Sequence, residues 1–115
     1  MYVHVMAAAV PTKAKEDYLR HAHQAQAVFR DHGAVEFAEY WGDEVPPGET
    51  TSFPRAVKCN DDETVVVSWI GWASKDAASK GMEAVMSDPR MADAEMPFDG
   101  KRLIWGGFDV LPNAG

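Results

Sequence analysis

Two helix-forming segments, each lying between extended apolar segments, constrain the fold of this chain more than any other feature. The first is predicted over residues 13–32, because its core-facing residues recur at three- and four-residue steps: Tyr18, Ala22, Ala25, Phe29 and His32. Thr12 is its expected N-cap and Gly33 its expected stop. The second helix is predicted from the cap Ser74 to about Ser87. Each helix must bury one face against the strands around it.

The extended segments predict four main strands. They cover Tyr2–Val10, Ala34–Trp41, Thr64–Trp72 and the run to Val110 that follows the turn Pro97-Phe98-Asp99-Gly100. Apolar residues occupy both alternating faces of the first and third strands, which indicates central positions in a sheet. Residues 53–58 are predicted as a short edge strand, because Pro54 cannot donate a ladder hydrogen bond. Residues 44–51 are the expected loop.

This order of elements predicts an α+β fold: a ferredoxin-like βαββαβ protomer with an antiparallel sheet and both helices on one face. At 115 residues we expect one domain over 1–111, followed by a short C-terminal tail over 112–115. The second face of the sheet has no cover in this order. A second subunit would be needed if that face carries the large rings of Tyr2, His4, Trp41, Trp69 and Trp105. The sequence therefore predicts a homodimer joined through the sheet face.

The charge balance bears on the possible partners. The chain has 18 acidic and 11 basic residues, a formal net charge of −7, and its basic residues are scattered. No nucleic-acid partner is expected, since phosphate binding requires clustered Lys and Arg. Apolar runs fall short of the roughly 20 residues of a membrane span, so no membrane partner is expected. One cysteine, Cys59, fits a reducing, cytoplasmic location, and no zinc-type spacing predicts a metal or cofactor.

Four segments carry a resemblance to a known family. They are Gly33-Ala34, residues 51–57 (Thr-Ser-Phe-Pro-Arg-Ala-Val), 88–91 (Asp-Pro-Arg-Met) and 96–102 (Met-Pro-Phe-Asp-Gly-Lys-Arg). With these segments the chain resembles the YbaA-like family of bacterial proteins, known as domain-of-unknown-function family 1428, and more distantly the dimeric α/β-barrel superfamily. The resemblance implies a ferredoxin-like protomer paired through its sheets. It brings no established activity and no catalytic residues.

A ligand pocket is predicted on the uncovered sheet face, lined by His4, Trp69 and Trp105. The small residues of the first strand suit packing under the helices, which would turn His4 to the opposite face. Trp69 and Trp105 lie on strands expected to flank the first strand. Other roles stay open, because a histidine can be a hydrogen-bonded core residue or a metal ligand, and the core or a dimer interface would also account for the rings.

Other polar residues have structural interpretations. His21 and His23 lie two apart on a helix, so their side chains diverge and we expect both on the surface. Arg55 and Asp99 lie beside turn-forming residues, which favours an ion pair or a loop clamp over catalysis. Arg90 follows Asp-Pro and is expected to tie down a helix end.

Three functions remain open from the sequence. The leading hypothesis is a homodimeric module that binds a small organic molecule. The second is a cofactor-free enzyme of the oxygenase or isomerase type, suggested only by the superfamily resemblance. The third is a structural or regulatory partner protein with no ligand site. A cleft that brings His4 near a second polar group would favour the first two.

Overall fold

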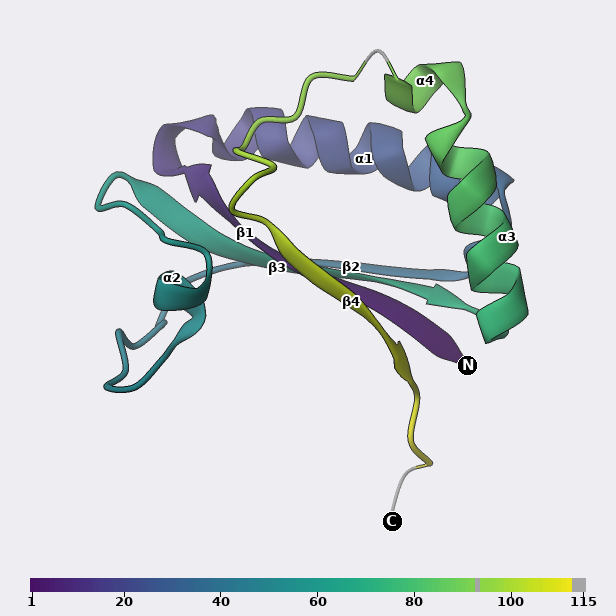
Figure 1. The fold of residues 1–115 in the computed structure, drawn as a ribbon. Coiled ribbons are helices and arrows are strands. Elements are labelled where there is room, and N and C mark those ends of the chain that lie inside the picture. The colour runs from purple at the N-terminus through teal and green to yellow at the C-terminus, as the bar shows by residue number, and fades with distance from the viewer. Residues whose placement is uncertain (93, 113–115) are drawn as a thin grey trace.

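The computed structural model describes residues 1–92 and 94–112 (Figure 1). In chain order it contains β1 (Tyr2–Pro11), the 3-10 turn η1 (Thr12–Ala14), α1 (Lys15–Asp31), β2 (Glu36–Trp41), α2 (Phe53–Ala56), β3 (Glu63–Trp72), α3 (Lys75–Met86), α4 (Pro89–Ala92) and β4 (Ile104–Asp109). The protein is α+β, with an open four-stranded antiparallel sheet and with α1 and α3 on one side of it. Of the tail expected over 112–115, residues 113–115 lie outside the described residues.

The sheet has the strand order β2-β3-β1-β4, and every neighbouring pair is antiparallel. The expectation that the strands carrying Trp69 and Trp105 flank the first strand is confirmed, because β1 pairs with β3 and β4. The pairing of β1 with β4 runs unbroken past Gly106 and Gly107. Gly107 leaves room for Tyr2, whose ring would overlap a Cβ at that position.

Both faces of the sheet bury apolar side chains. On the helix side, Ala8, Val10 and Val66 pack with Tyr18 and Ala22 of α1. On the opposite face, a second cluster forms from Ala7, Ala9 and Val65 with Val57, which follows α2. The segment around α2 therefore covers one end of the face that the helices leave open.

The prediction of which side chains of β1 face the helices is wrong. Tyr2 and His4 lie on the helix side together with Met6, as the packing of Tyr2 against Trp72 and of Met6 against the α1 cluster shows. The register places Trp105 beside Met6 on that side, and Trp41 contacts the same cluster. Among the five rings expected on the uncovered face, only Trp69 lies there, paired with Val5. The wider side chains fit under the helices because a cavity lies there.

Two local predictions also need correction. Phe53–Ala56 is a helical turn rather than an edge strand, because the Ser52 hydroxyl accepts a hydrogen bond of 3.2 Å from the Arg55 N–H and Pro54 occupies the first turn. Thr12 does not cap α1; its hydroxyl bonds that of Thr64 at 2.7 Å.

The other predicted helix signals are confirmed. The Ser74 hydroxyl accepts a hydrogen bond of 3.0 Å from the Ala77 N–H, which caps α3. Gly33 follows the end of α1 with a φ of +105°, the left-handed conformation that a helix stop requires. The short helical turn expected after Pro89 is α4.

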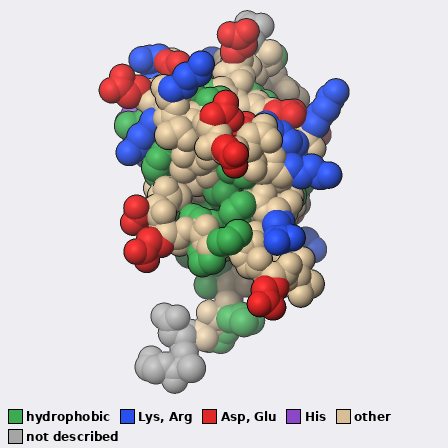
Figure 2. Space-filling model, turned by 90° about the vertical axis from the view of Figure 1, so that its left-hand side faces the viewer, with side chains coloured by type: hydrophobic (Ala, Val, Ile, Leu, Met, Phe, Trp, Pro, Cys, Tyr) green, Lys and Arg blue, Asp and Glu red, His purple; other side chains and the backbone are tan. Residues whose placement is uncertain are grey.

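Figure 2 looks onto the end of the molecule that carries α2. Hydrophobic side chains gather in the lower middle of this view, and acidic and basic side chains are mixed over its upper half. Phe53 at the start of α2 is 57% exposed. Basic groups on this face therefore lie among acidic ones rather than as a patch of one sign.

Candidate functional site

A cavity of about 400 Å³ lies between the helix-side face of the sheet and helices α1 and α3. This volume falls in the lower part of the usual range for small-molecule sites, about 300–1,000 Å³. Its apolar lining comes from Val5, Met6, Ala22, Ala25, Phe29, Ile70, Met82, Met86, Met91, Met96, Phe98, Leu103 and Trp105. Its polar lining comes from His4, Tyr18, His21, Gln26, Glu39 and Ser68. Apolar walls with a few polar groups are typical of ligand sites.

His4 stands on the central strand β1 at the floor of the cavity. The indole Nε1–H of Trp72 donates a hydrogen bond of 3.0 Å to its Nδ1 atom. The rings of Tyr2 and Trp105 lie beside it, with centroid distances of 5.6 and 5.9 Å. Burial lowers the pKa of His4, because the charged imidazolium loses contact with water. His4 is thus a positioned imidazole that favours its neutral form.

A carboxyl group from β2 meets a hydroxyl group from α1 in the same cavity. The Tyr18 hydroxyl donates a hydrogen bond of 2.5 Å to Oε1 of Glu39. Burial raises the pKa of Glu39, an effect that this hydrogen bond partly offsets. Burial and the neighbouring Glu39 also raise the pKa of Tyr18 well above its usual range. A partly desolvated carboxyl group in an apolar cavity is the kind of group found at functional sites.

His21 is a second histidine of the cavity, although the sequence predicted a surface position. It is half-buried on α1, and its ring makes an edge contact with Phe98 at a centroid distance of 6.4 Å. Burial lowers its pKa. His23 is exposed, as predicted.

The predicted pocket residues divide between the two faces of the sheet. His4 and Trp105 share the cavity under the helices, not one on the open face. Trp69 points to the opposite face, so the expectation that all three line one pocket is wrong. Trp105 is 65% exposed on the edge strand β4, so the cavity meets solvent beside it.

Methionine is concentrated in the cavity walls. Five of the six methionines of the chain line it: Met6, Met82, Met86, Met91 and Met96. Their unbranched, polarizable thioethers adapt to ligands of different shape. Such a wall suits an apolar ligand more than it suits a polar one.

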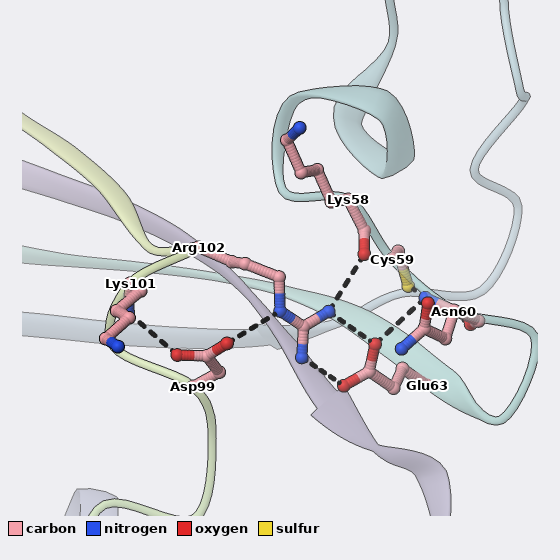
Figure 3. A network of polar contacts seen from close by, with 7 residues as sticks. All are labelled: Lys58, Cys59, Asn60, Glu63, Asp99, Lys101 and Arg102. Atoms are coloured by element: carbon pink, nitrogen blue, oxygen red, sulfur yellow. Dashed lines mark hydrogen bonds and ion pairs between the residues drawn. The ribbon is translucent and has the colours of Figure 1, made fainter.

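An ion-pair network lies outside the cavity, at the start of β4 (Figure 3). Both terminal nitrogens of Arg102 donate to the Glu63 carboxylate at 2.7 Å, and one also donates to the Lys58 carbonyl at 2.8 Å. The Arg102 Nε–H donates to Asp99 at 3.1 Å. These bonds hold the turn before β4 against the segment after α2. The prediction of an ion pair for Asp99 is confirmed.

Two other arginines have the structural roles predicted for them. The Arg55 guanidinium donates to the carbonyl oxygens of Pro47 and Gly48 at 2.8 and 3.3 Å, and so clamps the loop before α2. Arg90 donates to Asp88 and Asp31 at 2.8 and 2.9 Å. The second bond joins α4 to the end of α1.

Several features bear on cofactors and membranes. Within residues 1–92 and 94–112, no group of three or more His, Cys, Asp or Glu side chains is placed to hold a metal ion. No helix in this described part is long and apolar enough to cross a bilayer. Neither Lys nor Arg is among the described residues that line the cavity.

The fold defines an α+β protein with an apolar, methionine-rich cavity between its sheet and its two long helices. The chain belongs to the DUF1428 family of proteins of unknown function, whose model matches residues 1–100. It is 43% identical over 112 residues to the uncharacterized protein YbaA of Escherichia coli K12, and the match covers 96% of each chain. The same values hold for YbaA of Shigella flexneri. The resemblance to the YbaA-like family 1428, predicted from the four sequence segments, is confirmed.

Proposed function

We propose that this protein binds a small organic molecule in the cavity between its sheet and helices α1 and α3. The observation that carries the proposal is the convergence of His4, Glu39 and His21, from two strands and a helix, on an apolar space of about 400 Å³. Without a ligand, the apolar walls of this space would be left in contact with water, which is unfavourable. Polar groups at its surface would orient a bound molecule.

We also propose that the protomer is a single ferredoxin-like domain over 1–111 that forms a dimeric α/β barrel. The order β2-β3-β1-β4 and the split βαβ arrangement support the first part. The open sheet face supports the second, because it exposes large apolar side chains: Ile104 is 44% exposed, Phe108 55% and Tyr40 56%. On this proposal Trp69 serves the dimer interface and not the ligand. The net charge of −7 supports the absence of a nucleic-acid partner, and the single cysteine, Cys59, fits a reducing, cytoplasmic location.

A cofactor-free enzyme is the second candidate. Glu39 favours it, because a carboxyl group whose pKa is raised by burial holds its proton more readily and can serve as a general acid or base. In that case Glu39→Gln would abolish turnover of a bound substrate and leave its binding in place. Ligand binding is required by both candidates, so it is tested first.

Native mass spectrometry of the protein isolated from its own host tests ligand binding. We expect a dimer mass and a small-molecule adduct on the wild-type protein. Ala25→Trp fills the cavity from α1 and should remove the adduct, whereas Leu19→Trp, at an exposed position of the same helix, should keep it. Circular dichroism verifies that both variants fold. An adduct retained by folded Ala25→Trp protein, or absent from the wild type, would contradict the proposal.

A further inference from the structure

The hydrogen bond from the buried Trp72 indole determines which ring nitrogen of His4 carries the proton. Trp72 is fully buried, and an indole N–H can only donate a hydrogen bond. Its acceptor is the Nδ1 atom of His4, 3.0 Å away. An Nδ1 atom that accepts this bond has no hydrogen of its own. The neutral His4 ring therefore carries its proton on Nε2.

The same contact opposes protonation of His4. A second proton would have to sit on Nδ1, where it would face the N–H of Trp72 and leave that buried donor without an acceptor. Leaving a buried donor unpaired is unfavourable, and burial further disfavours the charged ring. His4 consequently offers a donor to a molecule in the cavity and has no free lone pair with which to act as a base.

The rest of the cavity restricts the charge of that molecule. No Lys or Arg side chain is among the described lining residues, so an anion would find no counter-charge there. An anion would also lie in the same cavity as the Glu39 carboxyl group. An unpaired charge in an apolar site is strongly unfavourable. The aromatic rings of Phe29, Phe98 and Trp105 and the methionine thioethers favour contact with a flat apolar skeleton.

We propose that Trp72 fixes His4 as an Nε2–H donor and that the cavity takes a mainly aromatic molecule that carries no negative charge and has a carbonyl oxygen that accepts this bond. The inference rests on the proposed function, because it names the ligand chemistry of the same cavity. His4 is the residue that touches the ligand, and Trp72 is a positioning residue that acts through it.

The protonation state is measurable without a ligand. Long-range ¹H–¹⁵N NMR of the imidazole rings at pH 7 should show His4 with its proton on Nε2. In Trp72→Phe the pKa of His4 should rise toward its ordinary value of 6.5, because Nδ1 is then free to accept a proton. A proton on Nδ1, or a charged ring at pH 7, would overturn the inference and leave the proposed function intact.

Three probes of one skeleton test the ligand class: 2-acetylnaphthalene with a carbonyl, 2-ethylnaphthalene without an acceptor, and the anion 2-naphthoate. Their affinities follow from quenching of tryptophan fluorescence. We expect the ketone to bind about tenfold more tightly than the hydrocarbon, as one added hydrogen bond allows. The anion should bind more weakly than both.

Matched variants assign the preference to His4. In His4→Leu, the ketone and the hydrocarbon should bind equally. In His4→Gln, whose amide restores a donor, part of the preference should return. His23→Leu, at an exposed position of α1, should behave as the wild type. A wild type that binds ketone and hydrocarbon equally, or the anion most tightly, overturns the inference while the cavity remains a ligand site. Binding of none of the three probes contradicts the proposed function as well.

Discussion

Gly81 of α3 lies so close to the ring of Trp72 that no side chain fits between them. A Cβ at position 81 would overlap the ring atoms Cζ3 and Cη2 and would lie 2.8 Å from the carbonyl oxygen of His32. This contact sets how α3 rests on β3. It also supports the indole that donates a hydrogen bond to His4. The packing of α3 and the protonation state of His4 are therefore linked.

Gly81→Ala should destabilise the protein. Alanine favours a helix over glycine by up to about 1 kcal/mol, but forcing a methyl group into a packed contact costs about 1–3 kcal/mol. We therefore expect a net loss of up to about 2 kcal/mol in the free energy of unfolding, measured by urea denaturation. Gly100→Ala is the control, since its Cβ would meet only the Met96 sulfur at 3.9 Å. A stabilised Gly81→Ala protein would show that α3 can shift away.

The Glu63–Arg102 ion pair should make stability fall in acid. The Arg102 guanidinium lowers the pKa of Glu63 from 4.5 to about 2. The contribution of this ion pair to the free energy of unfolding is complete above pH 4.5. It is lost as the pH falls toward 2, because Glu63 of the unfolded chain takes up its proton at a higher pH than Glu63 of the folded protein. Glu63→Gln should be less stable at pH 7 and should show a shallower decline between pH 4.5 and 2 in thermal unfolding. Glu83→Gln, at an exposed position, should keep the wild-type slope.

Phe108→Glu should dissociate the proposed dimer. The substitution places a charge on the sheet face within an interface that would bury on the order of 1,600 Å², and an unpaired buried charge is unfavourable. Sedimentation at micromolar concentration should show a dimer for the wild type and a monomer for the variant. Leu19→Glu on the exposed side of α1 should remain dimeric. A wild-type protein that sediments as a monomer would contradict the dimer proposal.

Tyr18→Phe should raise the pKa of Glu39 further. The Tyr18 hydroxyl donates to the Glu39 carboxylate and thereby stabilises its charged form. Without this bond, only the nearby His23 opposes the effect of burial on the carboxyl group. ¹³C NMR titration of the side-chain carboxyl carbons measures the change, with the exposed Glu36 of the same strand as the internal reference. An unchanged or lower pKa would show that water replaces the hydroxyl group.

The order of strands and helices could be predicted from the sequence because periodicity reports which residues are buried. Which face of β1 lies under the helices could not be predicted from the sequence, since Val3 and Val5 are as apolar as Met6 and Ala8. Small residues were expected under the helices, but the cavity leaves space there for larger ones. Residues 53–58 were misassigned because Pro54 indicates an edge strand or a helix start equally well, and Ser52 was the signal for the second.

The candidate site could be predicted only in part. His4 and Trp105 were recognised, but Glu39 was not. The sequence did hold a sign of its role. Glu39 is the charged member of the alternating set Val35, Phe37, Glu39 and Trp41, on the face of β2 that packs under α1. A charge in such a set costs free energy unless it has a partner or a function. Its partner, Tyr18, lies on a different element, and only the fold brings the two together.

The methionine walls make the cavity observable from within. Five methionine side chains line one cavity, and the ε-methyl group of the sixth methionine, Met1, lies near Gly71 and outside the cavity lining. Isotope labelling at this one atom type would give five resonances that report occupancy and one that serves as the reference. The pattern of shifts would locate a bound molecule against α3, β1 or the segment before β4. The protein thus carries its own set of spectroscopic probes for a ligand not yet identified.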